Sequence, residues 1–370
     1  MNDLLISTGK IIDCLNDGVY VCDRDRRIVF WSKSAERITG WRSEDVLGRA
    51  CLEGILNHVD KDGHRLCGEE YCPLHRAMIT GVTTNVPIIV FALHKDGRRV
   101  PTQVTTAPIQ NDAGEIIGGV ETFRDVSPMM EDLKRAQKIQ RQALQQDLPE
   151  DPRLHFSTFF MSYDIVGGDY YAIQPLDADR YGFLLADMEG HGIAAALYAM
   201  HLNILWNRHF QLLKSPSDFA AAVNEDLVKI FGSVVTFATA MCGVIDARAG
   251  TLCFTGAGGP TPLIIHKNWV FDEPKSTGPP LGVMEDIPYQ EKTVKLEAGD
   301  SILLFSDGAI EIQNSQDQWL GVEGFTQILK SLDYPNSPLS MRKLEKKLLK
   351  FSNDIRLQDD VTIIEARYFG

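Results

Sequence analysis

The most informative run in this chain of 370 residues is Tyr181-Gly182-Phe183-Leu184-Leu185-Ala186-Asp187-Met188-Glu189-Gly190-His191-Gly192. An apolar segment, residues 182–186, leads directly into Asp187, which is the pattern of a buried strand that holds a carboxylate at its end. The glycines that follow permit tight turns and a close approach of the main chain. A single aspartate of this kind is more often a turn or cap residue, so its meaning depends on the rest of the chain.

Three further segments place aspartates where strands are expected to end. They are Val166-Gly167-Gly168-Asp169-Tyr170-Tyr171, Ser301-Ile302-Leu303-Leu304-Phe305-Ser306-Asp307-Gly308 and Asp359-Asp360-Val361-Thr362-Ile363-Ile364. Strands that lie side by side would bring these carboxylates within a few ångströms, which is unfavourable unless cations neutralise them. Hard oxygen ligands select Mg²⁺ or Mn²⁺ over Zn²⁺. The sequence therefore predicts a divalent-metal site in the second half of the chain.

A polar connector, residues 128–151, divides the chain into two globular parts. It is rich in Gln, Lys and Arg and has no Gly or Pro between Pro128 and Pro149, so we expect a helix. Its apolar residues recur at helical spacing and form one stripe: Met130, Leu133, Ala136, Ile139, Ala143, Leu144 and Leu148. Such a stripe normally packs on a neighbouring domain or a partner helix.

The first part is predicted to be α+β. Two short strands at residues 19–22 and 28–31 precede small helices, and three longer strands follow at residues 86–93, 99–109 and 116–125. Asp96-Gly97 and Ala113-Gly114 supply the turns between the longer strands. This arrangement leaves room for a small ligand.

Thiols and imidazoles gather in the first part, at Cys51, His58, His64, Cys67, Cys72 and His75. At short spacings these groups can hold Zn²⁺ or an iron cofactor, with Cys51, Cys67, Cys72 and His75 as the candidate ligands. The cysteines at 67 and 72 are not spaced as a CxxC pair, and no second pair follows. A thiol redox role and buried structural cysteines with surface histidines are the alternatives.

Composition excludes several classes of partner. The 50 acidic and 37 basic side chains leave a formal charge of −13, which argues against general binding to nucleic acid or to an anionic membrane. No apolar run approaches the ~18 residues of a membrane span, and the start, Met1-Asn2-Asp3, lacks a secretion pattern. Seven cysteines, an odd number, favour reduced thiols and a cytoplasmic location.

Residues 8–127 resemble a PAS sensor domain. The resemblance is carried by Asp17-Gly18-Val19-Tyr20-Val21, Trp31-Ser32-Lys33-Ser34-Ala35-Glu36, His94-Lys95-Asp96-Gly97-Arg98-Arg99 and Gly118-Gly119-Val120-Glu121-Thr122-Phe123-Arg124-Asp125. PAS domains bind many unrelated ligands, so the fold is predicted and the ligand is not.

Residues 136–369 resemble the PPM-type serine/threonine phosphatases of the SpoIIE/RsbU kind. The matching runs are Ala136-Gln137-Lys138-Ile139-Gln140, the four aspartate segments quoted above, and Ile193-Ala194-Ala195-Ala196-Leu197. The resemblance implies an α+β protein in which an N-terminal PAS domain (8–127) and a helical signalling linker (128–151) precede a PPM-type domain (152–370). That domain would be a β-sandwich flanked by helices (α-β-β-α), with two divalent cations, Mn²⁺ or Mg²⁺, at one end.

The resemblance also implies a role for each site residue. Asp187 would bridge the two metals, with the Met188 carbonyl as a backbone ligand. Asp307 and Asp359 would complete the shell of one metal, and Asp169 would serve the second; Asp360 could take the place of Asp359. His191 is a candidate for protonating the departing seryl oxygen, and its alternative role is to order the turn before a helix.

The implied function is PAS-regulated hydrolysis of phosphoserine or phosphothreonine by metal-activated water. The implied substrate is a small STAS-type anti-sigma-factor antagonist, and the implied assembly is a homodimer through the PAS domain and linker. The linker helix would carry the signal by changing dimer packing or metal-site geometry.

Two departures from the family keep an alternative open. Glu189 stands where the family usually has a small residue, and Gly259 stands where an Asn-Ala-Gly-His run would place histidine. A pseudophosphatase that binds a phosphoprotein without hydrolysing it is therefore the alternative. Gly167-Gly168-Asp169-Tyr170-Tyr171 also echoes the signature of diguanylate cyclases, but the acidic runs at 187–191 and 359–362 have no place in that enzyme.

Overall fold

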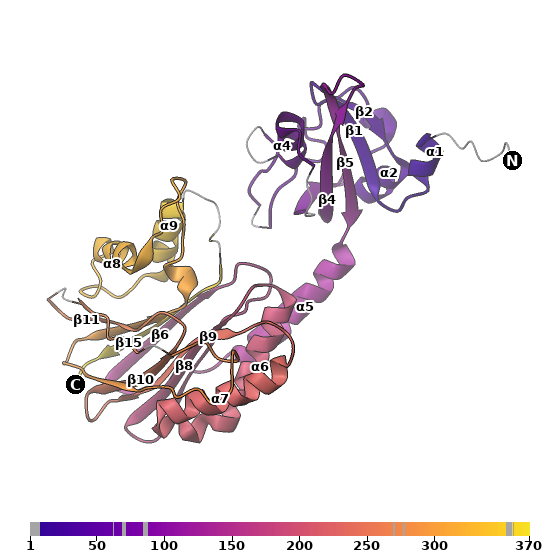
Figure 1. The fold of residues 1–370 in the computed structure, drawn as a ribbon. Helices are drawn as coiled ribbons and strands as arrows, with labels where there is room; N and C mark the ends of the chain where they lie inside the picture. Colours follow the sequence, from indigo (N-terminus) through magenta and orange to yellow (C-terminus); the bar gives the residue numbers. More distant parts are fainter. Residues whose placement is uncertain are drawn as a thin grey trace. The chain divides into compact units, whose positions relative to one another are not determined.

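The computed structural model describes residues 8–61, 63–68, 72–83, 88–268, 271–276, 278–352, 357 and 359–370. Val86 and Pro87, the start of one predicted strand, lie outside these residues. The chain forms two compact units, residues 1–132 and 133–370 (Figure 1). None of the helices in the described part of the chain has the length and apolar content of a membrane span.

The N-terminal unit is one antiparallel sheet with helices beside it. The sheet has the order β2-β1-β5-β4-β3, so the first strand pairs with the last one. The strands are β1 (Gly18–Asp23), β2 (Ile28–Trp31), β3 (Ile88–Leu93), β4 (Arg99–Gln110) and β5 (Ile116–Asp125). The helices are α1 (Thr8–Asp13), α2 (Lys33–Thr39), α3 (Ser43–Val46) and α4 (Pro73–Thr80). The predicted α+β arrangement of a PAS domain is confirmed.

Helix α5 (Ser127–Leu144) is shorter than the predicted connector. Gln146 lies beyond the end of the helix. Its side-chain amide nitrogen donates to the Tyr171 carbonyl, and its side-chain oxygen accepts from the Ile173 amide. Only part of the predicted apolar stripe packs within this chain: Met130 is buried and Leu144 packs on a core of the C-terminal unit, whereas Ala136, Ile139 and Ala143 are exposed. Ile139 is 57% exposed, whereas its neighbour Gln140 is 4% exposed.

The C-terminal unit contains two five-stranded sheets, with the orders β13-β10-β9-β8-β7 and β12-β11-β14-β15-β6. The first sheet comprises β7 (Tyr170–Pro175), β8 (Arg180–Met188), β9 (Ala238–Asp246), β10 (Thr251–Ala257) and β13 (Lys292–Lys295). The second comprises β6 (Leu154–Met161), β11 (Leu263–Ile265), β12 (Phe271–Asp272), β14 (Ser301–Phe305) and β15 (Val361–Tyr368). All strand pairs are antiparallel.

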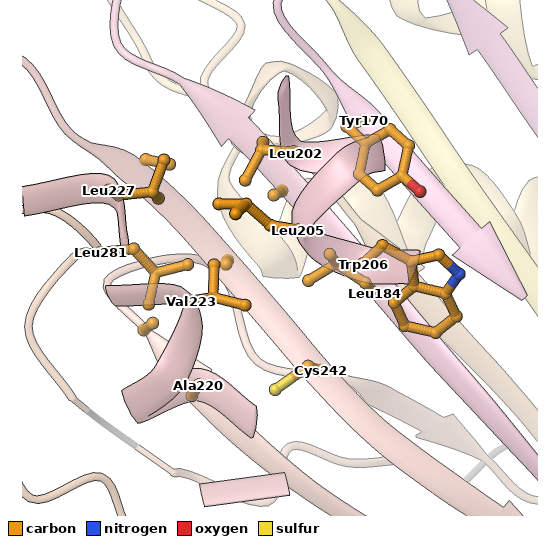
Figure 2. Close-up of a cluster of buried hydrophobic side chains, with 14 of the residues drawn as sticks. Tyr170, Leu184, Leu202, Leu205, Trp206, Ala220, Val223, Leu227, Cys242 and Leu281 are labelled. Atoms are coloured by element: carbon orange, nitrogen blue, oxygen red, sulfur yellow. The ribbon is translucent and has the colours of Figure 1, made fainter. Parts of the chain in front are cut away.

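Three hydrophobic cores separate four layers. The first lies between one sheet and the helices α6 (Ile193–His209) and α7 (Pro216–Phe231), with Trp206 and Leu205 fully buried (Figure 2). The second fills the space between the two sheets, where Phe183, Phe254 and Leu304 meet. The third lies under α8 (Gly321–Ser331) and α9 (Met341–Ser352). This order of layers confirms the predicted α-β-β-α sandwich.

Candidate metal centre

Three aspartates from distant parts of the chain meet at one end of the sandwich. Asp187 lies near the end of β8, Asp307 opens the short 3-10 turn Asp307–Ala309 that follows β14, and Asp359 precedes β15. One carboxylate oxygen from each lies within 4.8 Å of the others. Because each side chain is fixed by the end of a buried strand, the three carboxylates are held together rather than brought together by chance packing.

Asp169, just before β7, is not one of these three carboxylates, but it interacts with Asp187 and is 1% exposed. Its Oδ2 accepts hydrogen bonds from the hydroxyls of Ser306, at 2.9 Å, and Thr362. Its Oδ1 is buried and has no hydrogen-bond partner among the residues that the structure describes. A buried carboxylate oxygen without a donor is unfavourable unless a cation occupies the space it faces.

The clustered carboxylates also favour the binding of a cation. Burial raises the pKa of Asp187 to about 11, and the neighbouring carboxylates of Asp169 and Asp307 add to that rise. Burial likewise raises the pKa of Asp169 to about 7 and that of Asp359 to about 6. A bound divalent cation would favour the ionised forms and reverse these shifts. The donor set, together with the unpartnered buried oxygens of Asp169 and Asp307, therefore fits hard divalent cations.

Asp360 has different surroundings from its neighbour Asp359. Its Oδ1 accepts from the Tyr163 amide at 2.6 Å and its Oδ2 from the Gly168 amide at 2.5 Å. Asp360 is not among the three carboxylates that lie within 4.8 Å of one another. The structure thus places Asp359 in the cluster and uses Asp360 to hold the loop that carries Asp169.

The loop after β8 places the remaining predicted residues. The Met188 carbonyl oxygen lies beside Gly168, 3.4 Å from where a Cβ on that glycine would be. Glu189 is exposed, and its amide donates to the Phe237 carbonyl. Exposed His191 makes a 2.8 Å contact from Nδ1 to Oδ2 of Asp164.

Gly259 borders the centre without adding a polar group to it. It lines a small cavity together with Asp187, Thr239 and Ser306. The nearest atom to a Cβ built on Gly259 is the Thr239 Cβ, at 3.4 Å. Gly259 therefore places no side chain in the small cavity beside Asp187.

Sequence reasoning did not assign a role to four residues that support the centre: Asp164, Ser306, Thr362 and Gln140. Ser306 and Thr362 stand inside the acidic motifs, next to or near the aspartates, which is a usable signal because hydroxyls often orient ligating carboxylates. Asp164 and Gln140 carry no comparable signal, since only the fold brings them near the site.

The thiols of the N-terminal unit lie mostly in its core. Cys51 and Cys72 are each 7% exposed, and the Cys67 sulfur accepts a hydrogen bond from the His58 amide at 3.1 Å. Among the described residues, no thiol belongs to a group of three or more candidate ligands within 4.8 Å, so Cys51, Cys67, Cys72 and His75 are not gathered as a metal site.

A buried acid and a buried imidazole lie in the same unit. The Nε2 of His58 is 3.7 Å from Oε1 of Glu121. Burial raises the pKa of Glu121 to about 8 and lowers that of His58 to about 4. Both groups are therefore neutral between these two values.

Each of the two units matches the model of a known protein family. Residues 177–369 match the family model of Stage II sporulation protein E (SpoIIE), and residues 12–128 match the PAS fold. Phosphoserine phosphatase RsbP of Bacillus subtilis (strain 168) is 26% identical over 221 residues, which cover 59% of this chain and 52% of that protein. Phosphoserine phosphatase RsbU of the same organism is 22% identical over 305 residues, which cover 82% of this chain and 88% of that protein. The chain thus spans about half the length of RsbP and most of RsbU.

Solved structures show the same fold. The SiaA-PP2C domain of Pseudomonas aeruginosa matches with a TM-score of 0.57 and 23% identity, over 65% of this chain and 97% of that one. The RsbU and RsbW domains of Rv1364c from Mycobacterium tuberculosis match with a TM-score of 0.51 and 24% identity, over 62% of this chain and 64% of that one.

Proposed function

The chain belongs to the Stage II sporulation protein E (SpoIIE) family, and from this membership we propose that it is a divalent-metal-dependent protein phosphatase acting on phosphoserine or phosphothreonine. The observation that carries the proposal is the meeting of Asp187, Asp307 and Asp359 within 4.8 Å, with the buried Asp169 beside Asp187. RsbP and RsbU, the relatives described above, are themselves named phosphoserine phosphatases.

In this proposal Asp169, Asp187, Asp307 and Asp359, together with the Met188 carbonyl, would hold two divalent cations, Mn²⁺ or Mg²⁺. When bound, such cations neutralise phosphate oxygens and lower the pKa of water to near neutrality. Ser306 and Thr362 fix the orientation of Asp169 through its Oδ2, which leaves Oδ1 free for a cation. Asp360 keeps the Asp169 loop in place through two main-chain amides.

His191 is the proposed proton donor to the departing seryl oxygen. It is exposed at the rim of the centre, and Asp164 contacts its Nδ1 at 2.8 Å, which orients the ring. An imidazole held in this way presents Nε2 to solvent and to a substrate that approaches the carboxylates.

The proposed substrate is a small STAS-type signalling protein, and the N-terminal PAS unit is the proposed regulator. A homodimer through the PAS unit and linker is also part of the proposal. The exposed apolar residues of α5 support it: Ile139 is 57% exposed, and Ala136 and Ala143, from the same stripe, are exposed as well.

The test is hydrolysis of p-nitrophenyl phosphate by the full chain with Mn²⁺. We expect Asp187→Asn to lower kcat by about 10²–10³-fold or more, because it removes a ligand of the cations that stabilise the anionic transition state. Asp218→Asn, an exposed aspartate at the start of α7, is the matched control and should leave the rate unchanged. Removal of metal with EDTA should abolish the activity, and Mn²⁺ should restore it.

The same assay separates the alternative, a pseudophosphatase. Glu189 in the loop after Asp187 and the absence of a side chain at Gly259 are the features that favour it. If the unchanged chain binds Mn²⁺ but hydrolyses neither p-nitrophenyl phosphate nor a phosphoserine peptide, the phosphatase proposal is wrong and the binding role stands.

A further inference from the structure

Gln140 is a polar residue that α5 buries against the C-terminal unit. Its side chain is almost fully enclosed, with 4% of the residue exposed. Its Nε2 donates to the Gly167 carbonyl at 2.8 Å, and its Oε1 accepts from the Gly167 amide at 3.3 Å. A third contact, 3.5 Å long, runs from Nε2 to the Ala196 carbonyl of α6. The side-chain amide thus serves both main-chain groups of one residue, as a neighbouring strand would.

Gly167 lies two residues before Asp169, in a segment that is neither helix nor strand. The next residue, Gly168, donates its amide to Asp360. A Cβ on Gly167 would come within 2.9 Å of the Asp360 Oδ2 and 2.7 Å of the Phe160 ring. The segment is therefore held from two directions, by Asp360 on one side and by Gln140 on the other.

A cavity of about 320 Å³ lies between α5 and Asp169. Gln140, Arg141 and Leu144 line it from the helix, and Phe160, Asp169 and Tyr171 line it from the sheets. Because this space is not filled by side chains, packing alone does not fix the Asp169 segment against the helix. Hydrogen bonds, those of Gln140 among them, hold the segment on this side.

Gln137, one turn earlier on α5, extends the same contact. Its Nε2 donates to the Ile165 carbonyl, two residues before Gly167. The helix is thus joined to the Asp169 segment by two glutamine amides, and Gln140 is the one that is bonded to Gly167 at both of its main-chain groups.

Resting on the proposed function, we infer that Gln140 is a positioning residue for the metal centre. It does not touch the metals or the substrate. It fixes the main chain of Gly167, and through Gly168 it sets where the carboxylate of Asp169 lies. Loss of its hydrogen bonds lets the segment relax toward the cavity and weakens the cation site.

The first experiment compares Gln140→Ala with Gln142→Ala in the full chain. Gln142 is an exposed glutamine two residues further along α5 and serves as the matched control. Mn²⁺ binding is measured without substrate, from the electron paramagnetic resonance signal of free Mn²⁺. We expect Gln140→Ala to raise the Kd for Mn²⁺ by about 10-fold or more, as is common when a partner of a metal ligand is removed. Gln142→Ala should bind Mn²⁺ as the unchanged chain does.

The second experiment uses Gln140→Glu and a pH series. A protonated glutamic acid can still donate to the Gly167 carbonyl, whereas an ionised one presents only acceptors and repels that carbonyl. Relative to the unchanged chain at each pH, the Mn²⁺ affinity of Gln140→Glu should therefore fall as pH rises. If residue 140 only filled space, the ratio would not fall as pH rises, because the added carboxylate by itself attracts the cation. If Gln140→Ala fails to fold, this comparison within one folded variant still decides the matter.

The outcomes separate this inference from the proposed function. If the unchanged chain binds Mn²⁺ and hydrolyses p-nitrophenyl phosphate, and both Gln140 variants bind Mn²⁺ equally well at every pH, the positioning role is overturned while the phosphatase stands. If the unchanged chain binds no Mn²⁺, the proposed function fails, and this inference fails with it.

Discussion

Gly308 shows how closely the metal centre is packed at the scale of one residue. A Cβ at this position would lie 2.0 Å from the carbonyl oxygen of Asp360 and 3.2 Å from the Cβ of Asp359. Both contacts are with the segment that carries one of the three clustered carboxylates. The glycine that follows Asp307 is therefore required by the approach of two main-chain segments.

We expect Gly308→Ala to lower the free energy of unfolding by about 1–3 kcal/mol, because the added methyl group overpacks the site. It should also weaken Mn²⁺ binding, since Asp359 has to move. Gly259→Ala is the control: its Cβ would meet Thr239 at 3.4 Å, an ordinary contact, and its free energy of unfolding should stay within about 0.5 kcal/mol of the unchanged chain. Urea unfolding and a Mn²⁺ titration measure the two effects. Equal losses in both variants would contradict the assignment of Gly308.

At the scale of the element, α6 is the helix that supports β8 and its Asp187. Its buried face is made of small and large apolar side chains, and Leu205 and Trp206 are fully enclosed in the core that Figure 2 shows. The other face is open: Leu197 is 63% exposed. Leucine therefore occurs on α6 in two environments, buried at position 205 and exposed at position 197.

Leu205→Ala should lower the free energy of unfolding by about 2–5 kcal/mol, because it removes apolar contacts and leaves a cavity. Leu197→Ala should change it by less than about 0.5 kcal/mol, because its side chain already faces solvent. Thermal and urea unfolding of the full chain check both values. Similar losses for the two variants would mean that the exposed face of α6 is covered in solution.

In helix α5 the buried residues are not all apolar residues of the predicted stripe. The apolar stripe predicted a face that packs on a neighbouring domain or a partner helix; within this chain Met130 is buried, whereas Ala136, Ile139 and Ala143 are exposed. The residues that α5 buries against the C-terminal unit include Gln140, whose amide finds main-chain partners there. Hydrophobic periodicity cannot anticipate this outcome, because a buried amide is acceptable only when a specific partner is available.

At the scale of the whole molecule, α5 is the element that connects the two units. It begins at Ser127, and its later turns are hydrogen-bonded to the segment that carries Asp169. A signal that biases α5 between two arrangements would therefore reach the proposed metal centre.

We expect removal of residues 1–132 to change the basal rate of p-nitrophenyl phosphate hydrolysis by about fivefold or more, the low end of typical coupling between sites. The truncated chain keeps Gln137 and Gln140, so its Asp169 segment retains both helix contacts. Steady-state kinetics of the full and truncated chains at saturating Mn²⁺ make the comparison. Equal rates would count against regulation by the PAS unit.

The amino-acid sequence alone determined the division into two parts, the α+β class of each, and the aspartates from which the candidate site is built. It could do so because buried strands appear in the sequence as apolar runs. Several carboxylates at the ends of neighbouring strands also repel one another unless cations are bound. The PAS and SpoIIE-type resemblances likewise rest on short local runs of residues.

Only the tertiary structure decided the roles of the residues around these aspartates. Asp359 and Asp360 are equivalent in the sequence, but one joins the carboxylate cluster while the other accepts two main-chain amides. Gln140 acquired its partner from a segment 27 residues away. The physical reason is that a hydrogen bond or a shared cation depends on positions to within a fraction of an ångström, and those positions are set by the packing of all four layers rather than by any local run of residues.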